Sequence, residues 1–367
     1  MKVLHVTYDM RIGGTEMVIK NLVEGNKNND IEMSIFCIES PLGPWGESLK
    51  SMGIEIDGRD RQPGFDTSLI KAIRTHIKEN HIDVVHCHQY TPWVYGTLAA
   101  AFTSTKVIFT EHGRFYPDSS SWKRRFVNPI LSGLTSSVVA ISKATKDALV
   151  NFEYISPTKI DVVYNGIKPM LPSQSDTSQL RSKLNLPENA IVFGTVARLD
   201  PIKNQSMLIR AFSKVCTSIP NTYLLIVGDG ELMGDLQSLA NDLGLNQKVI
   251  FTGYEPYPAN YMALMNVFML PSLSEGTSIT LLEAMSMGTP CIVTNAGGNP
   301  EIVAHNENGL VVENNNETEL CQAMIEISES SELYDTLAKN AKPRFEKLFH
   351  LNNMVNTYID IYKNIAK

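Results

Sequence analysis

Short runs of apolar residues, rich in valine and isoleucine, alternate with longer amphipathic segments along almost the whole chain. Continuous apolar runs of this length are typical of strands buried on both faces of a sheet. Their alternation with helical segments predicts parallel sheets of the α/β class, covered by helices. We expect strands at 2–8, 31–38, 83–88, 106–110, 137–141 and 159–164 in the first half, and at 190–197, 222–228, 247–252, 266–270 and 289–294 in the second.

The alternation breaks once, where Ile167-Lys168-Pro169-Met170-Leu171-Pro172 precedes a polar stretch. Two prolines and a polar run favour an interdomain linker, which we place at 167–180. The 367 residues suffice for two domains. We therefore expect two Rossmann-like lobes, at 1–166 and 181–354, with a central cleft at the carboxyl ends of their strands. The tail from Leu351 to Lys367 has the apolar pattern of a terminal amphipathic helix.

Composition narrows the class of protein. A formal charge of −7 disfavours a nucleic-acid binder. The five cysteines are odd in number and lack CxxC spacing, so reduced thiols are favoured over disulfides or a zinc site. The first residues resemble a strand rather than a signal peptide, and no apolar run reaches the roughly 18 residues of a membrane span. We expect a cytoplasmic protein, at most peripheral to the inner face of a membrane.

The segment from Leu270 to Met285 carries the strongest chemical signal. A strand ends at Leu270, and a helix is expected to start near Thr277, where free N–H groups would bind a phosphate. Glu275 precedes this helix and Glu283 lies within it, eight positions later. Eight helical residues span about 12 Å. That separation suits one carboxylate at a sugar and the other at a ribose, with a diphosphate between them. The alternative is a capping acid and an ordinary surface glutamate.

A second segment, from Phe193 to Asn204, places Arg198 after a strand and Lys203 at the start of the next helix. Two cations at a strand end can stabilise a diphosphate leaving group as its charge develops. A surface arginine and lysine in a turn are the alternative.

Two first-lobe segments offer weaker signals. Gly13-Gly14 follows the first strand, and paired glycines let backbone N–H groups approach a phosphate or sugar; a simple turn is the alternative. His112, in Thr110-Glu111-His112-Gly113-Arg114, could contact the transferred sugar or position the acceptor, or be a satisfied strand-end histidine. For His86 and His88 we favour an ordinary structural role.

No Asp-x-Asp pair occurs in the sequence. Such a pair commonly holds a divalent metal in the single-lobe class of sugar transferases. Basic side chains and a helix end therefore fit better here, and we expect no metal or other cofactor. Nucleophile-elbow and Walker motifs are missing too.

In combination these segments resemble glycosyltransferase family four, the retaining transferases with the GT-B fold. The resemblance runs from Gly13-Gly14 through Arg198 and Lys203, the E-x7-E pair Glu275 and Glu283, and the loop Cys291–Glu301 to the tail helix.

The resemblance implies roles for matching positions. Glu275 would contact donor-sugar hydroxyls and Glu283 the ribose diol. Arg198 and Lys203 would hold the diphosphate, as would the backbone of the loop and helix start. His112 would touch the sugar. The tail helix, 355–367, would pack against the first lobe and belong to it together with 1–166. The remaining donor-binding positions implied are Gly13, Gly14, Gly253, Tyr254, Gly276, Thr277, Ser278, Ile279 and Thr280.

The chain departs from the family pattern at Glu275-Gly276-Thr277-Ser278, where many members have Glu-Gly-Phe-Gly. The Thr-Ser variant occurs among exopolysaccharide and lipopolysaccharide enzymes. We therefore expect transfer of a hexosyl group from a nucleotide-diphosphate sugar to a sugar or lipid-linked acceptor, with UDP-sugar as the commonest donor type of the family.

The sequence offers no obvious pair of opposed carboxylates for double displacement. A front-face mechanism, in which the leaving diphosphate deprotonates the acceptor hydroxyl, is preferred. Two alternatives stay open: another GT-B enzyme, such as a nucleotide-sugar 2-epimerase or a phosphorylase, and a non-catalytic nucleotide-sugar-binding subunit. An epimerase would convert the nucleotide sugar without any acceptor, which distinguishes it from a transferase.

Residues 121–131 combine three bases with Trp122, Phe126, Ile130 and Leu131. This composition is typical of a helix at a membrane interface. A solvated loop beside the acceptor cleft is the alternative.

Overall fold

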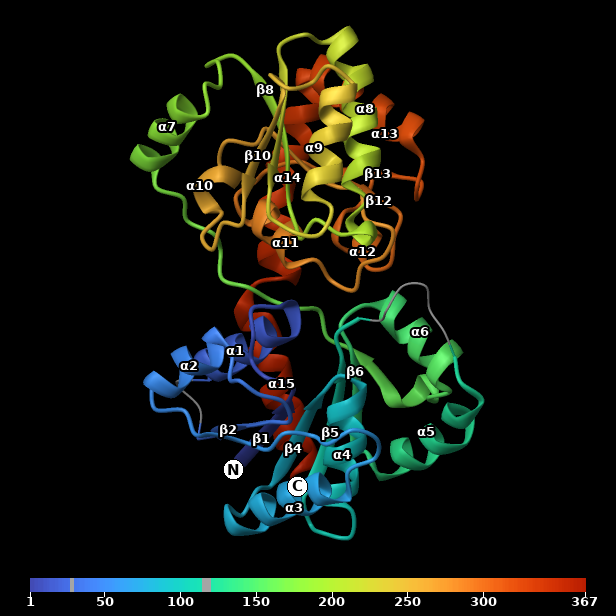
Figure 1. The fold of residues 1–367 in the computed structure, drawn as a ribbon. Coiled ribbons are helices and arrows are strands. Elements are labelled where there is room, and N and C mark those ends of the chain that lie inside the picture. The colour runs from blue at the N-terminus through green and yellow to red at the C-terminus, as the bar shows by residue number, and fades with distance from the viewer. Residues whose placement is uncertain (27–29, 114–119) are drawn as a thin grey trace. The chain divides into compact units, whose positions relative to one another are not determined.

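The computed structural model describes residues 1–26, 30–113 and 120–367, which form two compact units (Figure 1). The first comprises Met1–Gly166 and Leu351–Lys367, and the second Ile167–His350. Each unit is built on its own sheet of parallel strands, so the expected α/β class with two Rossmann-like lobes is confirmed.

The first unit contains a seven-stranded sheet in the order β3-β2-β1-β4-β5-β6-β7. Its strands are β1 (Lys2–Thr7), β2 (Glu32–Cys37), β3 (Ile56–Gly58), β4 (Val84–His88), β5 (Lys106–Glu111), β6 (Ser137–Ala140) and β7 (Ile160–Val162). Its helices are α1 (Gly14–Gly25), α2 (Pro44–Ser51), α3 (Thr67–Glu79), α4 (Tyr90–Ala100), α5 (Trp122–Leu134), α6 (Lys143–Glu153) and α15 (Leu351–Ile365).

Alternate residues of the central strands in this unit pack into two separate cores. Leu4, Val85 and Phe109 point to the side covered by α3, α4 and α6. Val3 and Val84 point to the other side, where α1 and α15 pack beside each other. Burial on both faces explains why these strands appear as unbroken apolar runs.

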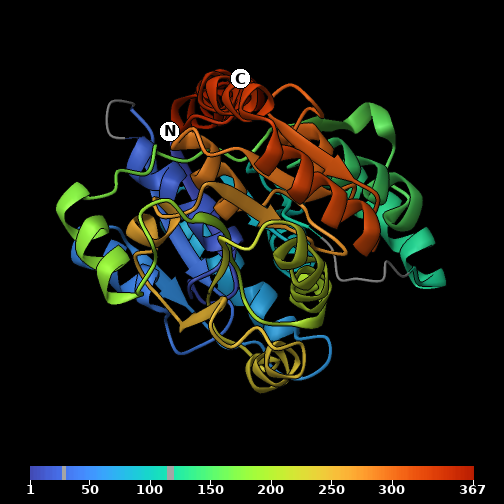
Figure 2. The ribbon, with the colours of Figure 1, turned by 90° about the horizontal axis from the view of Figure 1, so that it is seen from above.

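The second unit contains a six-stranded sheet in the order β10-β9-β8-β11-β12-β13. Its strands are β8 (Ile191–Val196), β9 (Thr222–Val227), β10 (Val249–Gly253), β11 (Val267–Leu270), β12 (Cys291–Thr294) and β13 (Gly309–Val312). Its helices are α7 (Gln174–Lys183), α8 (Gln205–Ser218), α9 (Met233–Asp242), α10 (Ala259–Met262), α11 (Ile279–Ser286), α12 (Asn299–Ile302), α13 (Glu317–Glu329) and α14 (Ser331–Leu348). α8 and α13 pack side by side over this sheet (Figure 1 and Figure 2).

Every expected strand range contains a strand, but the sequence analysis missed β3 and β13. β3 (Ile56-Asp57-Gly58) contains one apolar residue, and β13 (Gly309–Val312) contains three after a glycine, so neither produces a long apolar run. Part of the expected linker, 167–180, is helical, because Ser173 accepts a hydrogen bond from the Asp176 N–H and begins α7. The terminal helix begins at Leu351, where the apolar pattern of the tail begins, and the first unit includes it from Leu351, four residues before the expected boundary at 355.

Candidate active site

The strand order of the second sheet reverses between the neighbours β8 and β11. Ligands bind at such a switch point in open α/β sheets, because the loops that follow the two strands diverge there. Both charged segments singled out in the sequence follow these strands. The loops are joined by a hydrogen bond of 2.7 Å from the Leu273 N–H to the Ile202 carbonyl oxygen.

Lys203 and Glu275 form an ion pair between these two loops. Lys203 Nζ lies 2.7 Å from Glu275 Oε1, which also accepts a hydrogen bond of 2.6 Å from Ser272 Oγ. The Glu275 side chain is only 7% exposed. The predicted donor-sugar carboxylate and the predicted phosphate-binding cation are therefore direct partners.

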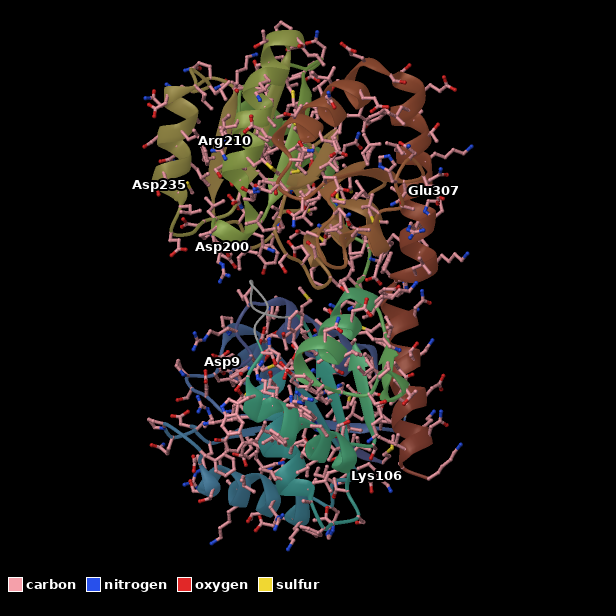
Figure 3. All side chains as sticks on the ribbon, turned by 90° about the vertical axis from the view of Figure 1, so that its right-hand side faces the viewer. Asp9, Lys106, Asp200, Arg210, Asp235 and Glu307 are labelled. Carbon is pink, nitrogen blue, oxygen red and sulfur yellow. The ribbon has the colours of Figure 1, made fainter. Side chains whose placement is uncertain are left out.

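Asp200 organises the loop that carries the two cations. Its carboxylate accepts hydrogen bonds from the Ile202 and Lys203 N–H groups, which starts the 3-10 turn Pro201–Lys203. Arg198 Nε lies 2.7 Å from Asp200 Oδ2, yet its side chain stays 75% exposed. Asp200 lies at the loop end of this unit, and Arg210 further along α8 (Figure 3). Lys203 thus lies in this turn, whereas the sequence analysis placed it at the start of the helix.

Gly297 fits closely against the backbone of Glu275. A Cβ built on Gly297 would lie 1.8 Å from the Glu275 carbonyl oxygen, and its φ of +52° is in the left-handed region. The Gly298 N–H donates a hydrogen bond of 3.1 Å to the same oxygen. The loop after β12, which resembled the family's donor loop, therefore supports Glu275 directly.

Helix α11 begins at Ile279, two residues after the expected start near Thr277, and the Ser278 hydroxyl caps it. Gly276 and Thr277 lie in the loop before it. Only the part from Ile279 to Glu283 is helical, so the 12 Å expected from eight helical residues does not apply. The N–H groups at the helix start belong to Ile279, Thr280 and Leu281, with Leu281 bonded to the cap.

Glu283 lies half-buried on α11, and desolvation raises its pKa from 4.5 to about 7. A carboxyl with such a pKa near a helix start is unusual for a surface glutamate, and perturbed carboxyls concentrate at functional sites. This observation favours the functional interpretation of Glu283.

Gly253 is the last residue of β10 and Tyr254 follows it, at the edge of the same sheet. Gly253 has a φ of +79°, and its carbonyl accepts a hydrogen bond from the Gly228 N–H. The Tyr254 side chain is 56% exposed. An exposed ring at the end of an edge strand is available for stacking on a ligand.

The sequence analysis missed Gly228-Asp229-Gly230, which positions the Arg198 loop. A Cβ at Gly228 would lie 2.0 Å from the Ala197 oxygen, and one at Gly230 would lie 2.3 Å from the Leu199 oxygen. The Leu199 N–H also donates to the Asp229 oxygen. A Gly-x-Gly directly after a buried strand was the signal available in the sequence.

In the first unit, Gly13 precedes α1 and Gly14 is its first residue. Gly13 has an extended φ of −167°, which any residue could adopt, and a Cβ there would meet the Glu16 carboxylate. A Cβ on Gly14 would meet nothing within 4 Å. The backbone conformation at these two positions does not require glycine. The space beside Gly14 is open to a ligand.

His112 follows β5 directly, and its Nε2 lies 2.9 Å from His88 Nδ1. Burial lowers its pKa to about 3, so the ring is neutral at pH 7. His86 and His88 are fully buried on β4 and hydrogen-bonded, in agreement with a structural role. Arg114, the last residue of the segment that drew attention to His112, lies outside the described residues.

Among the described residues, one group of histidines and acids is compact enough to bind a metal ion: His5, His86 and His88. All three rings are buried in the first unit. The Glu275 and Lys203 loops belong to the other unit.

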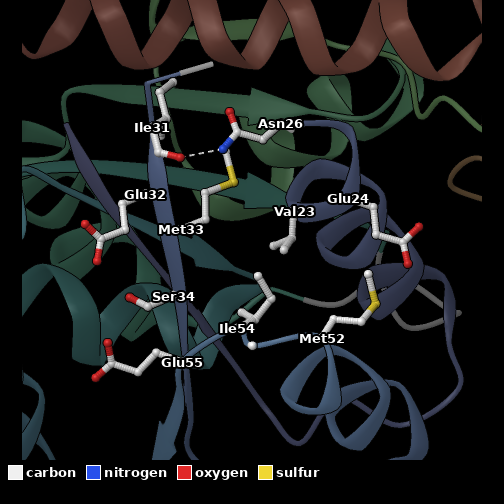
Figure 4. A pocket seen from close by; sticks show the side chains of 11 residues that line it. Val23, Glu24, Asn26, Ile31, Glu32, Met33, Ser34, Met52, Ile54 and Glu55 are labelled. Atoms are coloured by element: carbon white, nitrogen blue, oxygen red, sulfur yellow. Dashed lines mark hydrogen bonds between the residues drawn. The ribbon is translucent and has the colours of Figure 1, made fainter. Parts of the chain in front are cut away.

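A pocket of about 510 Å³ lies in the first unit, between α1 and β2 (Figure 4). It contains none of the residues predicted for the donor site. Glu24, Glu32 and Glu55 line it, and three carboxylates would repel a diphosphate. We therefore do not assign this pocket to the donor. Its lining is Val23, Glu24, Asn26, Ile31, Glu32, Met33, Ser34, Met52, Gly53, Ile54 and Glu55.

Helix α5 turns most of its apolar side chains to the surface. Its buried residues are Asn128, Leu131 and Ser132. Arg124, whose guanidinium bonds to Glu153, is held against the protein. The exposed apolar residues are Trp122 (72%), Phe126 (65%), Val127 (45%), Ile130 (68%) and Leu134 (45%). Within the described ranges, no helix is both long and apolar enough to span a bilayer.

Each unit contains a sheet of parallel strands, and the charged residues of the second unit lie at the switch point of its sheet, beside the start of α11. This architecture is the GT-B fold of glycosyltransferases. A glycosyltransferase from Rickettsia africae superposes with a TM-score of 0.90, at 22% identity, over 100% of this chain and 98% of that chain. Anabaena HepE in complex with UDP superposes with a TM-score of 0.87, at 22% identity, over 99% of this chain and 100% of that chain.

Two family models together account for most of the chain. Glycosyltransferase family four matches residues 12–170, and glycosyl transferases group 1 matches residues 176–344. The chain therefore belongs to the group 1 glycosyltransferases of family four.

Curated relatives are consistent with this assignment. The Escherichia coli UDP-Gal:alpha-D-GlcNAc-diphosphoundecaprenol alpha-1,3-galactosyltransferase is 27% identical over 99% of this chain and 96% of its own length. The Bacillus anthracis N-acetyl-alpha-D-glucosaminyl L-malate synthase is 26% identical over 83% of this chain and 81% of its own length.

Proposed function

We propose that this glycosyltransferase transfers a hexosyl group from a UDP-sugar to an acceptor hydroxyl, with retention of anomeric configuration, in the synthesis of a cell-surface polysaccharide or glycolipid. The observation that carries the proposal is the Lys203–Glu275 ion pair beside α11 at the sheet's switch point. It brings a carboxylate suited to sugar hydroxyls and a cation suited to phosphate into one site.

The donor contacts follow from the chemistry of each group. Glu275 accepts hydrogen bonds from hydroxyls of the transferred sugar, and Glu283 from the ribose diol. Lys203 and the exposed Arg198 neutralise the diphosphate, together with the N–H groups of Thr277, Ser278, Ile279 and Thr280. Gly276 contributes to the loop that binds the donor, and Gly253 and Tyr254 border the base. Gly13, Gly14 and His112 of the first unit add contacts to phosphate and sugar.

In the proposed step the bond between the anomeric carbon and the diphosphate oxygen breaks, and the acceptor oxygen forms its bond on the same face. The acceptor proton passes to the departing phosphate oxygen. Lys203 and Arg198 stabilise the charge that develops on the diphosphate, so no metal ion is required.

The choice of donor and acceptor rests on relatives. The E. coli relative is named for UDP-Gal and for a GlcNAc-diphosphoundecaprenol acceptor, and the Anabaena neighbour binds UDP. We therefore propose UDP as the carrier and a lipid-linked sugar as the acceptor.

The test combines binding and turnover. Thermal unfolding is followed with UDP, GDP and ADP; a ligand at 100 times its Kd adds about 2.7 kcal/mol of stability. Transfer is then measured with UDP-galactose and a short-chain GlcNAc-diphospholipid, with and without EDTA. We expect UDP, but not GDP or ADP, to stabilise the protein. The product should be α-linked by NMR, and EDTA should not reduce the rate of transfer.

A preference for GDP or ADP would refute the donor assignment, and a β-linked product would refute retention. Conversion of the donor sugar without any acceptor would favour an epimerase, and UDP binding without turnover on any acceptor would favour a non-catalytic subunit. Abolition of transfer by EDTA, restored by a divalent ion, would refute metal independence.

We also propose that the exposed face of α5 contacts an anionic membrane surface and keeps the enzyme peripheral to the inner leaflet. Trp122, Phe126 and Ile130 are spaced four residues apart and exposed, as an interfacial helix requires. Lys123 and Arg125 are exposed beside them and complement anionic lipid headgroups.

Liposome flotation tests this contact. Arg124 is kept, because its loss would disturb Glu153. The variants are Trp122→Ser with Phe126→Ser, and Lys123→Glu with Arg125→Glu; Phe102→Ser, at a fully exposed phenylalanine outside α5, is the control. We expect both pairs to lose binding to vesicles containing phosphatidylglycerol while the control keeps it. Unchanged flotation of both pairs would reject the contact.

A further inference from the structure

Four histidines of the first unit lie along one face of its sheet. His5 on β1 is paired with His86 on β4, and His88 on β4 with Thr110 on β5. His86 and His88 are two residues apart, and so are Thr110 and His112, so each pair points to the same side. This side is the one covered by α1 and α15.

Three of the rings form a continuous hydrogen-bonded chain. His5 Nδ1 lies 2.9 Å from His88 Nε2, and His88 Nδ1 lies 2.9 Å from His112 Nε2. Only the two end atoms, His5 Nε2 and His112 Nδ1, lack a partner within the described part of the chain.

A second chain holds the neighbouring rings in place. The Tyr362 hydroxyl lies 2.7 Å from His86 Nδ1, and His86 Nε2 lies 2.7 Å from Thr110 Oγ1. The Tyr358 hydroxyl completes it, 3.1 Å from Thr110 Oγ1. His86 is packed on His88, with ring centroids 4.1 Å apart, so the His88 ring has little freedom to turn.

The protons of three neutral imidazoles in such a chain must all point the same way, because each ring has one donor and one acceptor. Burial lowers the pKa of each ring far enough to keep it neutral at pH 7. Either every Nδ1 carries the proton, and His112 ends the chain with a donor, or every Nε2 does, and His5 ends it with one.

The surroundings of the two ends decide between these arrangements. His5 is completely buried, so an N–H on its Nε2 would stay unpaired, and orphaned buried N–H groups are rarer than unpaired acceptors. His112 Nδ1 is also buried in the ligand-free chain, but His112 as a residue is partly exposed and stands at the carboxyl end of β5, the sheet edge where solvent or a ligand oxygen can reach its proton. The chain therefore favours a donor at the His112 end.

We propose that His5 and His88 are positioning residues that fix His112 as its Nδ1–H tautomer, so that it donates a hydrogen bond to a ligand oxygen and does not act as a base. This inference rests on the proposed function for the identity of that oxygen, a hydroxyl of the donor sugar. The tautomer itself is a property of the ligand-free chain.

Nitrogen-15 NMR of the histidine-labelled full-length protein, without donor, tests the tautomer directly. The ring nitrogen shifts distinguish Nδ1–H from Nε2–H, and a His112→Asn variant assigns the His112 signals. We expect His5, His88 and His112 all as Nδ1–H. An Nε2–H tautomer at His112 would overturn the proposal, and so would one stoichiometric zinc ion retained on the rings of His5, His86 and His88.

Two substitutions at His88 separate positioning from packing. In His88→Asn the amide nitrogen replaces Nδ1 and can still donate to His112 Nε2, whereas His88→Leu offers no donor. We expect His112 to stay Nδ1–H in the asparagine variant and to become a tautomer mixture in the leucine variant. kcat/KM should fall roughly tenfold in the leucine variant only.

A loss of activity in both variants with an unchanged His112 tautomer would overturn the positioning role. If His88→Leu fails to fold, the wild-type and His88→Asn spectra still decide the tautomer. Should the protein transfer no sugar at all, the NMR result stands by itself, so failure of the proposed function and failure of this inference are distinguishable.

Discussion

Lys203 and Glu275 neutralise each other at the point where the proposed donor must bind. An incoming diphosphate competes with Glu275 for the ammonium group, and sugar hydroxyls compete with Lys203 and Ser272 for the carboxylate. The pair keeps both side chains in fixed positions before binding, which reduces the ordering that the donor must impose. It also means that neither residue can be removed without changing the other.

Replacement of Glu275 separates charge from packing. Glu275→Gln keeps the shape and a partner for Ser272, so we expect kcat/KM to fall roughly 100-fold with little change in Tm. Glu275→Ala should lose as much activity and also about 1–2 kcal/mol of stability, because Lys203 loses its partner. Steady-state kinetics and thermal melts measure both. Turnover like that of the wild type in either variant would refute the assigned site.

Glu283 gives a pH-dependent test. Its pKa is about 7 in the folded chain and 4.5 ordinarily, so between these values the folded state binds more protons, and the free energy of unfolding falls as pH rises. Glu283→Gln removes the free-energy cost of burying the carboxylate charge. We expect the variant to be more stable than the wild type by about 3 kcal/mol at pH 8 and equal to it at pH 4.

The same variant should bind UDP more weakly at pH 8, because a neutral amide accepts the ribose hydroxyl bonds less strongly than a carboxylate. Wild-type affinity for UDP should fall below pH 7, as Glu283 takes up its proton. Denaturant melts and calorimetric titration at both pH values check this. Equal stability of both proteins at pH 8 would contradict the burial of the charge.

At the level of elements, the loop after β12 supports the loop after β11. Gly297→Ala would force a methyl group onto the Glu275 carbonyl oxygen, in a backbone region that L side chains rarely adopt. We expect a loss of about 2–4 kcal/mol and a large fall in activity. Gly234→Ala in α9, where a Cβ meets nothing within 4 Å, should instead gain about 0.5–1 kcal/mol. Denaturant melts that rank the two variants equally would contradict this packing.

The order and type of the elements could be predicted from the sequence because each buried strand leaves a continuous apolar run. The edge strands β3 and β13 could not, because β3 has one apolar residue and is mostly exposed, and β13 has only three apolar residues after a glycine. The polar run that begins α7 favours a loop by composition and forms a helix with no buried residue.

The site was predictable as residue types at the ends of strands, but not as contacts. Arg198, Lys203 and Glu275 follow from loop position, and Glu283 from its spacing to Glu275. The direct bond between Lys203 and Glu275 joins residues 72 positions apart, and depends on β8 and β11 being neighbours. The start of α11 also moved, because the Ser278 hydroxyl caps the helix better than the glycine and threonine before it.

For the whole molecule, the path of the chain matters most. It leaves the first unit once, after Gly166, and returns at Leu351. The entry and exit of the second unit lie side by side, since the Ile167 N–H donates a hydrogen bond of 3.0 Å to the Phe349 oxygen. The returning helix α15 then buries Met354, Tyr358 and Tyr362 in the first unit's core.

Truncation after His350 tests this arrangement. We expect the second unit to keep a cooperative thermal transition that UDP raises, because its core is complete without α15. The first unit should lose its own transition, since the buried face of α15 is removed. Differential scanning calorimetry with and without UDP compares truncated and full-length chains. Two intact transitions in the truncated chain would contradict the dependence.

The return of α15 also sets an order of events during synthesis. Domains generally fold as units while the chain emerges from the ribosome, the N-terminal one first. Here the first unit cannot complete its core until Tyr358 and Tyr362 have been synthesised. The second unit has all of its residues once His350 has emerged. The lobe translated first is therefore the one completed last. Until then, its unfinished apolar face is the surface that a chaperone would need to protect.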